Sequence, residues 1–110
     1  MLEYKDKINI SRRDSITGDL TQIYNQILAD VQINKQSFWW ENSKSLQTSN
    51  NSEIADYFVF TKKENNNLRT WDLIDFENYF WENIKLQIIS KDLIDFENIE
   101  PFIEILCKLI

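Results

Sequence analysis

The sequence predicts a mainly α-helical protein: one compact domain, residues 1–110, of about four to five helices. Three observations favour this fold class. The chain holds one Gly and one Pro, which disfavours a β-sandwich built on many tight hairpins. Apolar residues recur at helical spacing in two long segments. The 43% hydrophobic content and the fifteen aromatic residues supply a core for a chain of this length.

The clearest helix is expected in residues 14–33, because their apolar side chains follow the i, i+3, i+4, i+7 spacing of one helix face. A second amphipathic helix is expected over residues 71–89 and a short one over 91–99. Pro101 would end or kink the short helix and open a final one. The apolar face of the first helix would consist of Leu20, Ile23, Tyr24, Ile27, Leu28 and Val31, and the final helix would bury Phe102, Ile105, Leu106 and Leu109.

The middle of the chain is harder to assign. Residues 37–46 read as a short helix or an irregular aromatic segment, and 53–63 fit either a helix or a strand. The stretch YFVFT favours β structure, so a small β-hairpin at 57–71 is the alternative, which would make the class α+β. Asn-rich and Ser-rich stretches at 48–53 and 62–67 indicate loops.

The heptapeptide DLIDFEN occurs at residues 72–78 and again at 92–98. Thr70 and Ser90 stand two places before the copies and are good helix N-caps. The copies therefore read as two helix starts, with Leu and Phe facing inward and Asp facing out. Two interpretations stay open: duplication of a structural segment, or a paired binding surface.

Glu77 and its twin Glu97 fall inside the apolar arc of the helical projection. A buried carboxylate without a partner is costly. Three outcomes are open: each Glu pairs with Arg12, Arg13 or Arg69, or reaches water at the helix edge, or faces a groove where a partner supplies the cation.

The net charge of −6 is unevenly distributed. Residues 1–70 hold nine acidic and nine basic residues, whereas residues 71–110 hold nine acidic residues against Lys85, Lys91 and Lys108. A one-sided acidic field steers association toward a basic partner. It argues against direct nucleic-acid binding, which favours basic domains. A solubilising surface is the simpler alternative.

The composition excludes several kinds of chemistry. The chain contains no His, so His-based catalysis and His-ligated metals are ruled out, and one Gly cannot build a phosphate loop. Cys107 is interpreted as a packing residue. No apolar run is long enough for a membrane span or a secretion signal, so we expect no membrane association. A single Cys cannot form an internal disulfide, which favours a cytoplasmic location. We also expect no cofactor and no metal. An enzyme using Asp72, Asp75 and Glu82 as metal or acid–base groups is the least favoured hypothesis.

The sequence therefore predicts a protein-binding inhibitor of the immunity-protein or phage and plasmid-inhibitor type. Its acidic C-terminal half would neutralise a basic target, a toxin or a nucleic-acid enzyme, whose phosphate-binding site is cationic. Trp71 and Tyr79 would serve as aromatic anchors, although Trp71 could instead pack on the core. The alternative function is a structural or adaptor subunit that self-associates, as a homodimer, through surface aromatics. The predicted partner-binding residues are Trp71, Asp72, Asp75, Glu77, Tyr79, Glu82, Asp92, Asp95 and Glu97.

Overall fold

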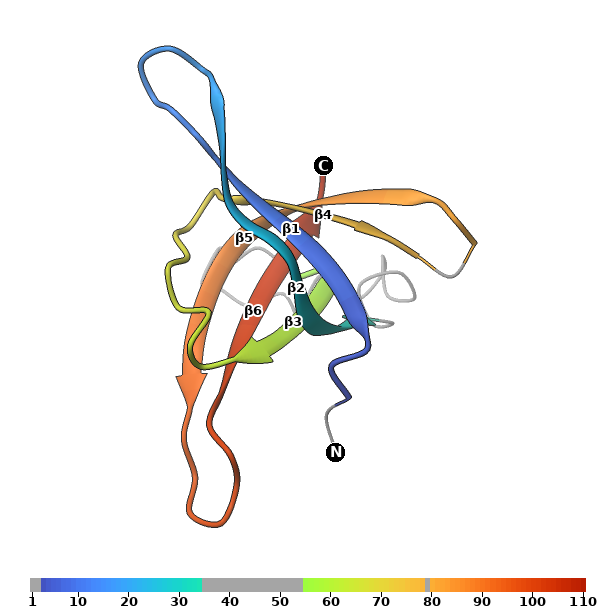
Figure 1. Ribbon diagram of the computed structural model, residues 1–110, viewed down its shortest axis with the longest axis vertical. Helices are drawn as coiled ribbons and strands as arrows, with labels where there is room; N and C mark the ends of the chain where they lie inside the picture. Colours follow the sequence, from blue (N-terminus) through green and yellow to red (C-terminus); the bar gives the residue numbers. More distant parts are fainter. Residues whose placement is uncertain (1–2, 35–54, 79) are drawn as a thin grey trace, which may run out of the picture.

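The computed structural model describes residues 3–34, 55–78 and 80–110, and this part of the chain is all β (Figure 1). Six strands form a closed antiparallel barrel in the order β1-β2-β3-β6-β5-β4. Two three-stranded meanders, β1–β3 and β4–β6, close on each other through the β3–β6 and β1–β4 pairs. The strands are β1 (Asp6–Arg13), β2 (Leu20–Ile33), β3 (Tyr57–Lys62), β4 (Leu73–Glu77), β5 (Asn83–Ile94) and β6 (Phe102–Leu109).

The prediction of a mainly helical domain is therefore wrong, and so is the α+β alternative. The described residues contain no helix, and hence none long and apolar enough to cross a membrane. Residues 37–46, expected as a short helix or an aromatic segment, lie outside the described residues.

Residues 14–33 imitate a helix because β2 is bulged. Ile8 of β1 lies opposite Ile27, but Ile10 lies opposite Tyr24, so two steps on β1 match three on β2. Gln26 occupies the irregularity with a φ of 51°, and its N–H donates to Asn9 Oδ1 at 2.8 Å. A bulge shifts the two-residue alternation of a strand by one position. The resulting spacing of three between inward side chains looks like a helical period.

Residues 71–89 form β4, a turn and β5 instead of one helix. Asn78 ends β4 because its Oδ1 accepts the N–H groups of Phe80 and Glu82, both at 2.9 Å. Phe76 then lies opposite Ile84 across the hairpin. Cross-strand partners point to the same face of a sheet, and a separation of eight residues is also close to two helical turns. The apolar pattern alone could not distinguish the two structures.

The two remaining predicted helices are also strands or turns. The segment 91–99 contains the end of β5 and the turn that follows it, and Pro101 precedes β6 rather than a helix. The proposed hairpin at 57–71 is wrong as well. Residues 57–62 do form a strand, β3, but it pairs with β2 and β6, and residues 68–71 form no strand.

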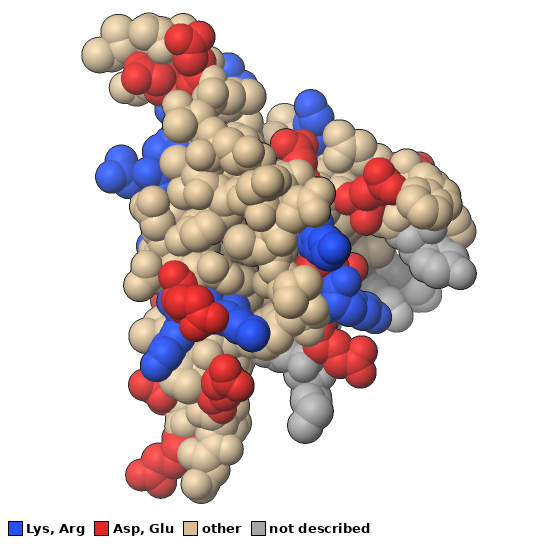
Figure 2. Space-filling view, in the orientation of Figure 1, with Lys and Arg blue, Asp and Glu red and all other residues tan. Residues whose placement is uncertain are grey.

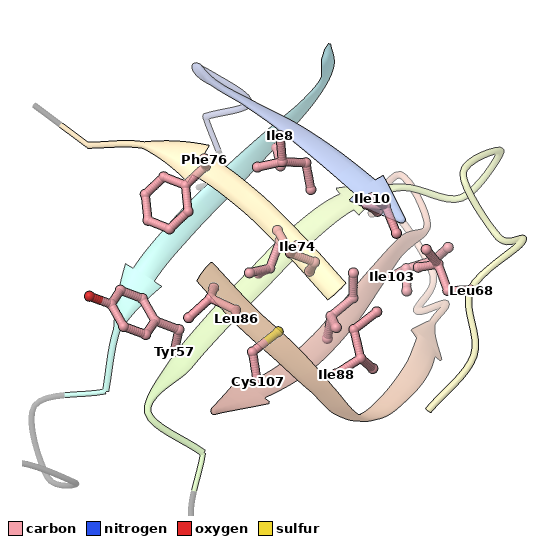
Figure 3. Packing of buried hydrophobic residues seen from close by; sticks show 13 residues of the cluster. Ile8, Ile10, Tyr57, Leu68, Ile74, Phe76, Leu86, Ile88, Ile103 and Cys107 are labelled. Atoms are coloured by element: carbon pink, nitrogen blue, oxygen red, sulfur yellow. The ribbon is translucent and has the colours of Figure 1, made fainter. Parts of the chain in front are cut away.

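All six strands contribute inward side chains to a single core (Figure 3). Burial alternates along β6, where Ile103, Ile105 and Cys107 point inward. Leu68, from the β3–β4 connection, packs against the same cluster. The core consists of Ile8, Ile10, Ala29, Tyr57, Val59, Leu68, Ile74, Phe76, Leu86, Ile88, Ile103, Ile105 and Cys107.

Cys107 lies on the inward face of β6 as a fully buried free thiol. Burial raises its pKa from the ordinary 9.0 to about 12, because the thiolate is poorly solvated in an apolar core. We expect a thiol reagent at pH 8 to label the unfolded chain but not the native protein. The folded pKa exceeds the unfolded one, so Cys107 should also lower the free energy of unfolding as pH rises from about 9 to about 12. Rapid labelling of native protein at pH 8 would contradict this burial.

Three strand connections extend beyond the barrel body as hairpins (Figure 1). The β1–β2 hairpin projects at the top of the view, the β4–β5 hairpin at the right and the β5–β6 hairpin at the bottom. Because the barrel is closed, its backbone edges are paired. The hairpins are therefore the parts of the described chain that reach furthest toward other molecules.

Candidate functional site

The nine predicted binding residues do not lie on one face. Trp71 and Asp72 lie in the loop before β4, and the β4–β5 and β5–β6 hairpins carry the others except Tyr79, which lies outside the described residues. The two hairpins occupy opposite ends of β5, a strand of 12 residues and so up to about 36 Å in length. The β4–β5 hairpin carries Asp75, Glu77 and Glu82, and the β5–β6 hairpin carries Asp92, Asp95 and Glu97.

Asp72 is a structural residue. Arg12 Nε donates to its Oδ1 and Arg12 Nη2 to its Oδ2, both at 3.0 Å, and the backbone N–H of Arg69 donates to Oδ2 at 2.8 Å. The Asp72 side chain is 3% exposed and that of Arg12 is 21% exposed. The hydrogen bond to Asp72 raises the pKa of Arg12 above its ordinary value. A carboxylate held this way is not available to a partner.

The turn of the β4–β5 hairpin presents two aromatic side chains. Phe80 is 74% exposed and Trp81 84% exposed. Glu77 and Glu82 flank them, and both are exposed. Asn78 Nδ2 donates to Glu82 Oε1 at 3.1 Å, which helps to shape the turn. Aromatic residues are enriched at protein contacts. Phe80 and Trp81 add to the predicted anchors Trp71, which is also exposed, and Tyr79, which lies outside the described residues.

The β5–β6 hairpin is the most acidic part of the chain. From residue 92 to residue 104 it carries five acidic residues and no basic one. Three exposed apolar residues lie among the acids, and one of them, Phe96, is 62% exposed. Figure 2 shows red side chains along this hairpin at the bottom of the view. We call these eight residues the acidic hairpin: Asp92, Leu93, Asp95, Phe96, Glu97, Ile99, Glu100 and Glu104.

Two carboxylates of the acidic hairpin oppose each other directly. Asp92 on β5 lies opposite Glu104 on β6, and like charges in that position destabilise a strand pair. The neighbouring Lys91 instead donates through Nζ to Asn66 O at 3.2 Å. Within residues 3–34, 55–78 and 80–110, none of the five carboxylates forms a salt bridge. The hairpin therefore holds negative charge that no cation of the described residues neutralises through a salt bridge.

Tyr4 shows this negative charge near the base of the hairpin. Burial raises its pKa, and the carboxylates of Glu100, Asp30 and Glu64 raise it further. The carboxylates act because they disfavour the phenolate. Carboxylates from three separate segments of the chain therefore lie near Tyr4.

The opposed carboxylates lead to a stability prediction. Asp92→Lys should place opposite charges across β5 and β6 and raise the free energy of unfolding by up to about 1 kcal/mol. Asp95→Lys is the matched control, because Asp95 follows the last paired residue of β5 and has no strand partner. Urea denaturation of the two variants measures the difference. Equal midpoints would mean that Asp92 and Glu104 do not repel each other significantly.

The two glutamates that the helical projection placed on an apolar face are both exposed. Glu77 ends β4, and Glu97 lies in the turn after β5. Of the three outcomes considered for Glu77 and Glu97, the structure shows the second, in which the carboxylates reach water. Of the three arginines considered as their partners, Arg12 is bound to Asp72 instead, and neither Arg13 nor Arg69 forms a salt bridge within the described residues.

The two DLIDFEN copies adopt different structures. In the first, Asp72, Ile74 and Phe76 all point inward. In the second, Leu93 lies opposite the inward Ile103, because a register shift between Ile88 and Ser90 reverses the alternation. A shift of one residue moves every following side chain to the other face.

Sequence reasoning missed the exposed apolar residues because it placed the Phe of each copy in a core. The signal that could have found them is the run of residues 92–104 itself, in which apolar residues alternate with acids and no base occurs. The described residues bring no group of three or more potential metal ligands together. Neither protein-family models, nor curated proteins, nor solved structures gave a match to this chain.

Proposed function

We propose that this protein is a small acidic protein-binding inhibitor that neutralises a basic, nucleic-acid-acting target through its acidic hairpin. The observation that carries this proposal is a set of five carboxylates that form no salt bridge in the part of the chain that the structure describes, interspersed in sequence with three exposed apolar side chains. Both features concern the same hairpin, which projects from the barrel (Figure 1).

The charges supply steering and selectivity. Complementary charge accelerates association and disfavours partners of the same sign. The opposition of Asp92 and Glu104 disfavours the free hairpin, so a Lys or Arg of the partner placed between them would relieve a repulsion as well as form new contacts. A cationic partner is therefore favoured over a neutral one.

The apolar residues supply area. Interfaces commonly take most of their binding energy from a few central anchors, surrounded by a rim that excludes water. Phe96 is the largest exposed side chain of the acidic hairpin, and the exposed Leu93 and Ile99 lie three residues before and after it in the sequence. We assign Phe96 as the central anchor and the carboxylates as its rim.

The target class follows from charge. Proteins that act on nucleic acid carry cationic surfaces that bind phosphate groups. A projecting acidic hairpin can occupy such a surface and exclude the nucleic acid. Inhibition is thus the direct consequence of binding at that place.

Charge reversal tests the proposal. The triple variant Asp92→Lys, Asp95→Lys, Glu97→Lys should lose partner capture from an extract of the source cells, with captured proteins identified by mass spectrometry. The control Glu3→Lys, Asp19→Lys, Glu64→Lys makes the same change in net charge at exposed positions outside the hairpin and should retain the partner. The captured partner should be basic and should lose its nucleic-acid activity on binding. Equal capture by both variants, at low and moderate salt, would reject the acidic hairpin as the binding site.

Self-association is the second candidate function, and the exposed Phe80 and Trp81 favour it. A dimer joined by these aromatics would resist salt, whereas contacts of the acidic hairpin would weaken as salt rises. Sedimentation of wild type and of Trp81→Ala over a salt series separates the two. A salt-resistant dimer that Trp81→Ala dissociates supports self-association.

A further inference from the structure

An open groove of about 850 Å³ lies between the base of the β1–β2 hairpin and the loop that precedes β4. It shares no residue with the acidic hairpin, and three of its lining residues are arginines. The lining consists of Arg12, Arg13, Asp14, Ser15, Thr21, Ile23, Arg69, Thr70, Trp71, Asp72, Leu73, Gln87 and Ile110.

Trp71 stands in this groove in a conformation that its residue type disfavours. Its φ is 80°, a region that Gly and Asn adopt far more readily. Its N–H donates to Ile88 O at 2.9 Å, which holds the backbone in place, and the indole remains 62% exposed. The indole is not part of the core, and among the described residues its ring contacts Lys108. Residues with a strained backbone occur preferentially at active sites and ligand-binding sites.

The charge of the groove differs from that of the rest of the molecule. Arg12 is neutralised by Asp72. Asp14 accepts the N–H groups of Thr17 and Ile16, which lower its pKa, so its carboxylate is engaged with the hairpin backbone. Asp14 remains anionic, so the three arginines and two aspartates of the lining leave one net positive charge, with Arg13 and Arg69 as the cations that Asp72 does not pair.

Both arginines can donate to a ligand. Arg13 Nη1 reaches Gly18 O at 3.4 Å, which leaves its other guanidinium N–H groups open. The Arg69 side chain is exposed and makes no hydrogen bond or ion pair within the described residues. Hydroxyl groups of Ser15, Thr21 and Thr70 lie in the same lining. Guanidinium groups and hydroxyls are the usual partners of phosphate oxygens.

We propose that this groove binds a nucleotide, with the base stacked on Trp71 and the phosphates held by Arg13 and Arg69. Lys108 Nζ lies 5.6 Å from the centre of the Trp71 ring and adds a cation at that end of the groove. Stacking on an aromatic ring beside arginines is a common way to hold a base and its phosphates together. The inference goes beyond the proposed function and uses different residues, so either can fail alone.

A mononucleotide is favoured over a nucleic-acid strand. The chain carries a net charge of −6, and Asp19 lies in the adjacent β1–β2 connection, outside the groove lining. A long polyanion leaving the groove would meet these charges, whereas a nucleotide ends within it. The groove volume is also within the range of ordinary small-molecule sites.

Calorimetric titration of the full chain with ATP, GTP, inorganic triphosphate and an octathymidylate tests the proposal. ATP or GTP should bind more tightly than triphosphate, which lacks a base, and at least as tightly as the octamer. Arg13→Gln and Arg69→Gln should each weaken nucleotide binding by about tenfold, since a hydrogen bond to a charged group is lost. Trp71→Asn should weaken it by about tenfold or more.

Trp71→Asn also separates a ligand role from a structural one. Because Asn accepts a positive φ more readily than Trp, this variant should melt no lower than the wild type while losing nucleotide affinity. The matched control is Trp81→Asn, at a second exposed Trp with a φ of 64°, which should leave nucleotide affinity unchanged. A lower melting temperature with unchanged affinity in Trp71→Asn would overturn the proposal. So would the absence of nucleotide binding at millimolar concentration, or preference for the octamer.

Discussion

Asp72→Ala is expected to lower the free energy of unfolding by about 3 kcal/mol, because it leaves the partly buried Arg12 guanidinium without its counter-ion. The estimate stands at the low end of the usual range, since the Arg12 side chain is 21% exposed. The substitution also removes the acceptor of the Arg69 N–H. Urea denaturation with linear extrapolation measures the loss.

The repeat supplies the control for this prediction. Asp92 occupies the same position in the second DLIDFEN copy, with the same six residues after it, but it is exposed and faces Glu104. Asp92→Ala should change stability by no more than about 0.5 kcal/mol, with any change on the stabilising side. Equal losses at both positions would show that Asp72 owes its effect to local sequence and not to Arg12.

Phe76→Ala is expected to lower the free energy of unfolding by about 3–5 kcal/mol, as is usual for a large aromatic removed from a core. Phe76 is 7% exposed and packs edge-on against Tyr57, with ring centres 6.1 Å apart. Thermal and urea denaturation both report the loss. No rearrangement of a closed six-stranded barrel easily fills the cavity, because the surrounding strands are mutually paired.

Phe96 is the matched position in the second copy. Its side chain is 62% exposed, so Phe96→Ala should leave stability within about 0.5 kcal/mol of the wild type. The same variant should weaken capture of the proposed basic partner, since it removes the assigned anchor. A stability loss at Phe96 as large as that at Phe76 would mean that the acidic hairpin folds back onto apolar surface.

The prediction of the fold failed for physical reasons that particular residues show. Tyr24 and Ile27 have helical spacing because a bulge lies between them. Phe76 and Ile84 share a face because they are cross-strand partners in a hairpin, although two helical turns would bring them together as well. A turn made by the Asn78 side chain replaced the Gly or Pro on which turn prediction depends.

The described members of the predicted site are distributed over a loop and two hairpins. The acidic character of the C-terminal half is a property of the sequence and accounts for the acidic hairpin. The sequence does not show that the acidic residues are divided between the two ends of β5, since an amphipathic helix would have kept these charges on one face. The groove with Arg13, Arg69 and Trp71 is formed by segments more than fifty residues apart, and no local sequence pattern predicts it.

By itself, the sequence determined the size of the core, the sign and place of the net charge, the absence of histidine chemistry and the presence of a duplicated heptapeptide. Only the tertiary structure decided what that heptapeptide becomes. The first copy is a core strand because β1 and β5 pair on both sides of it. The second enters a turn, on the opposite alternation, because the register shift at Ile88 precedes it. Seven identical residues differ in burial because strand pairing is non-local. The partner strands and their register determine which side chains of a segment point into the core, and the segment's own sequence does not.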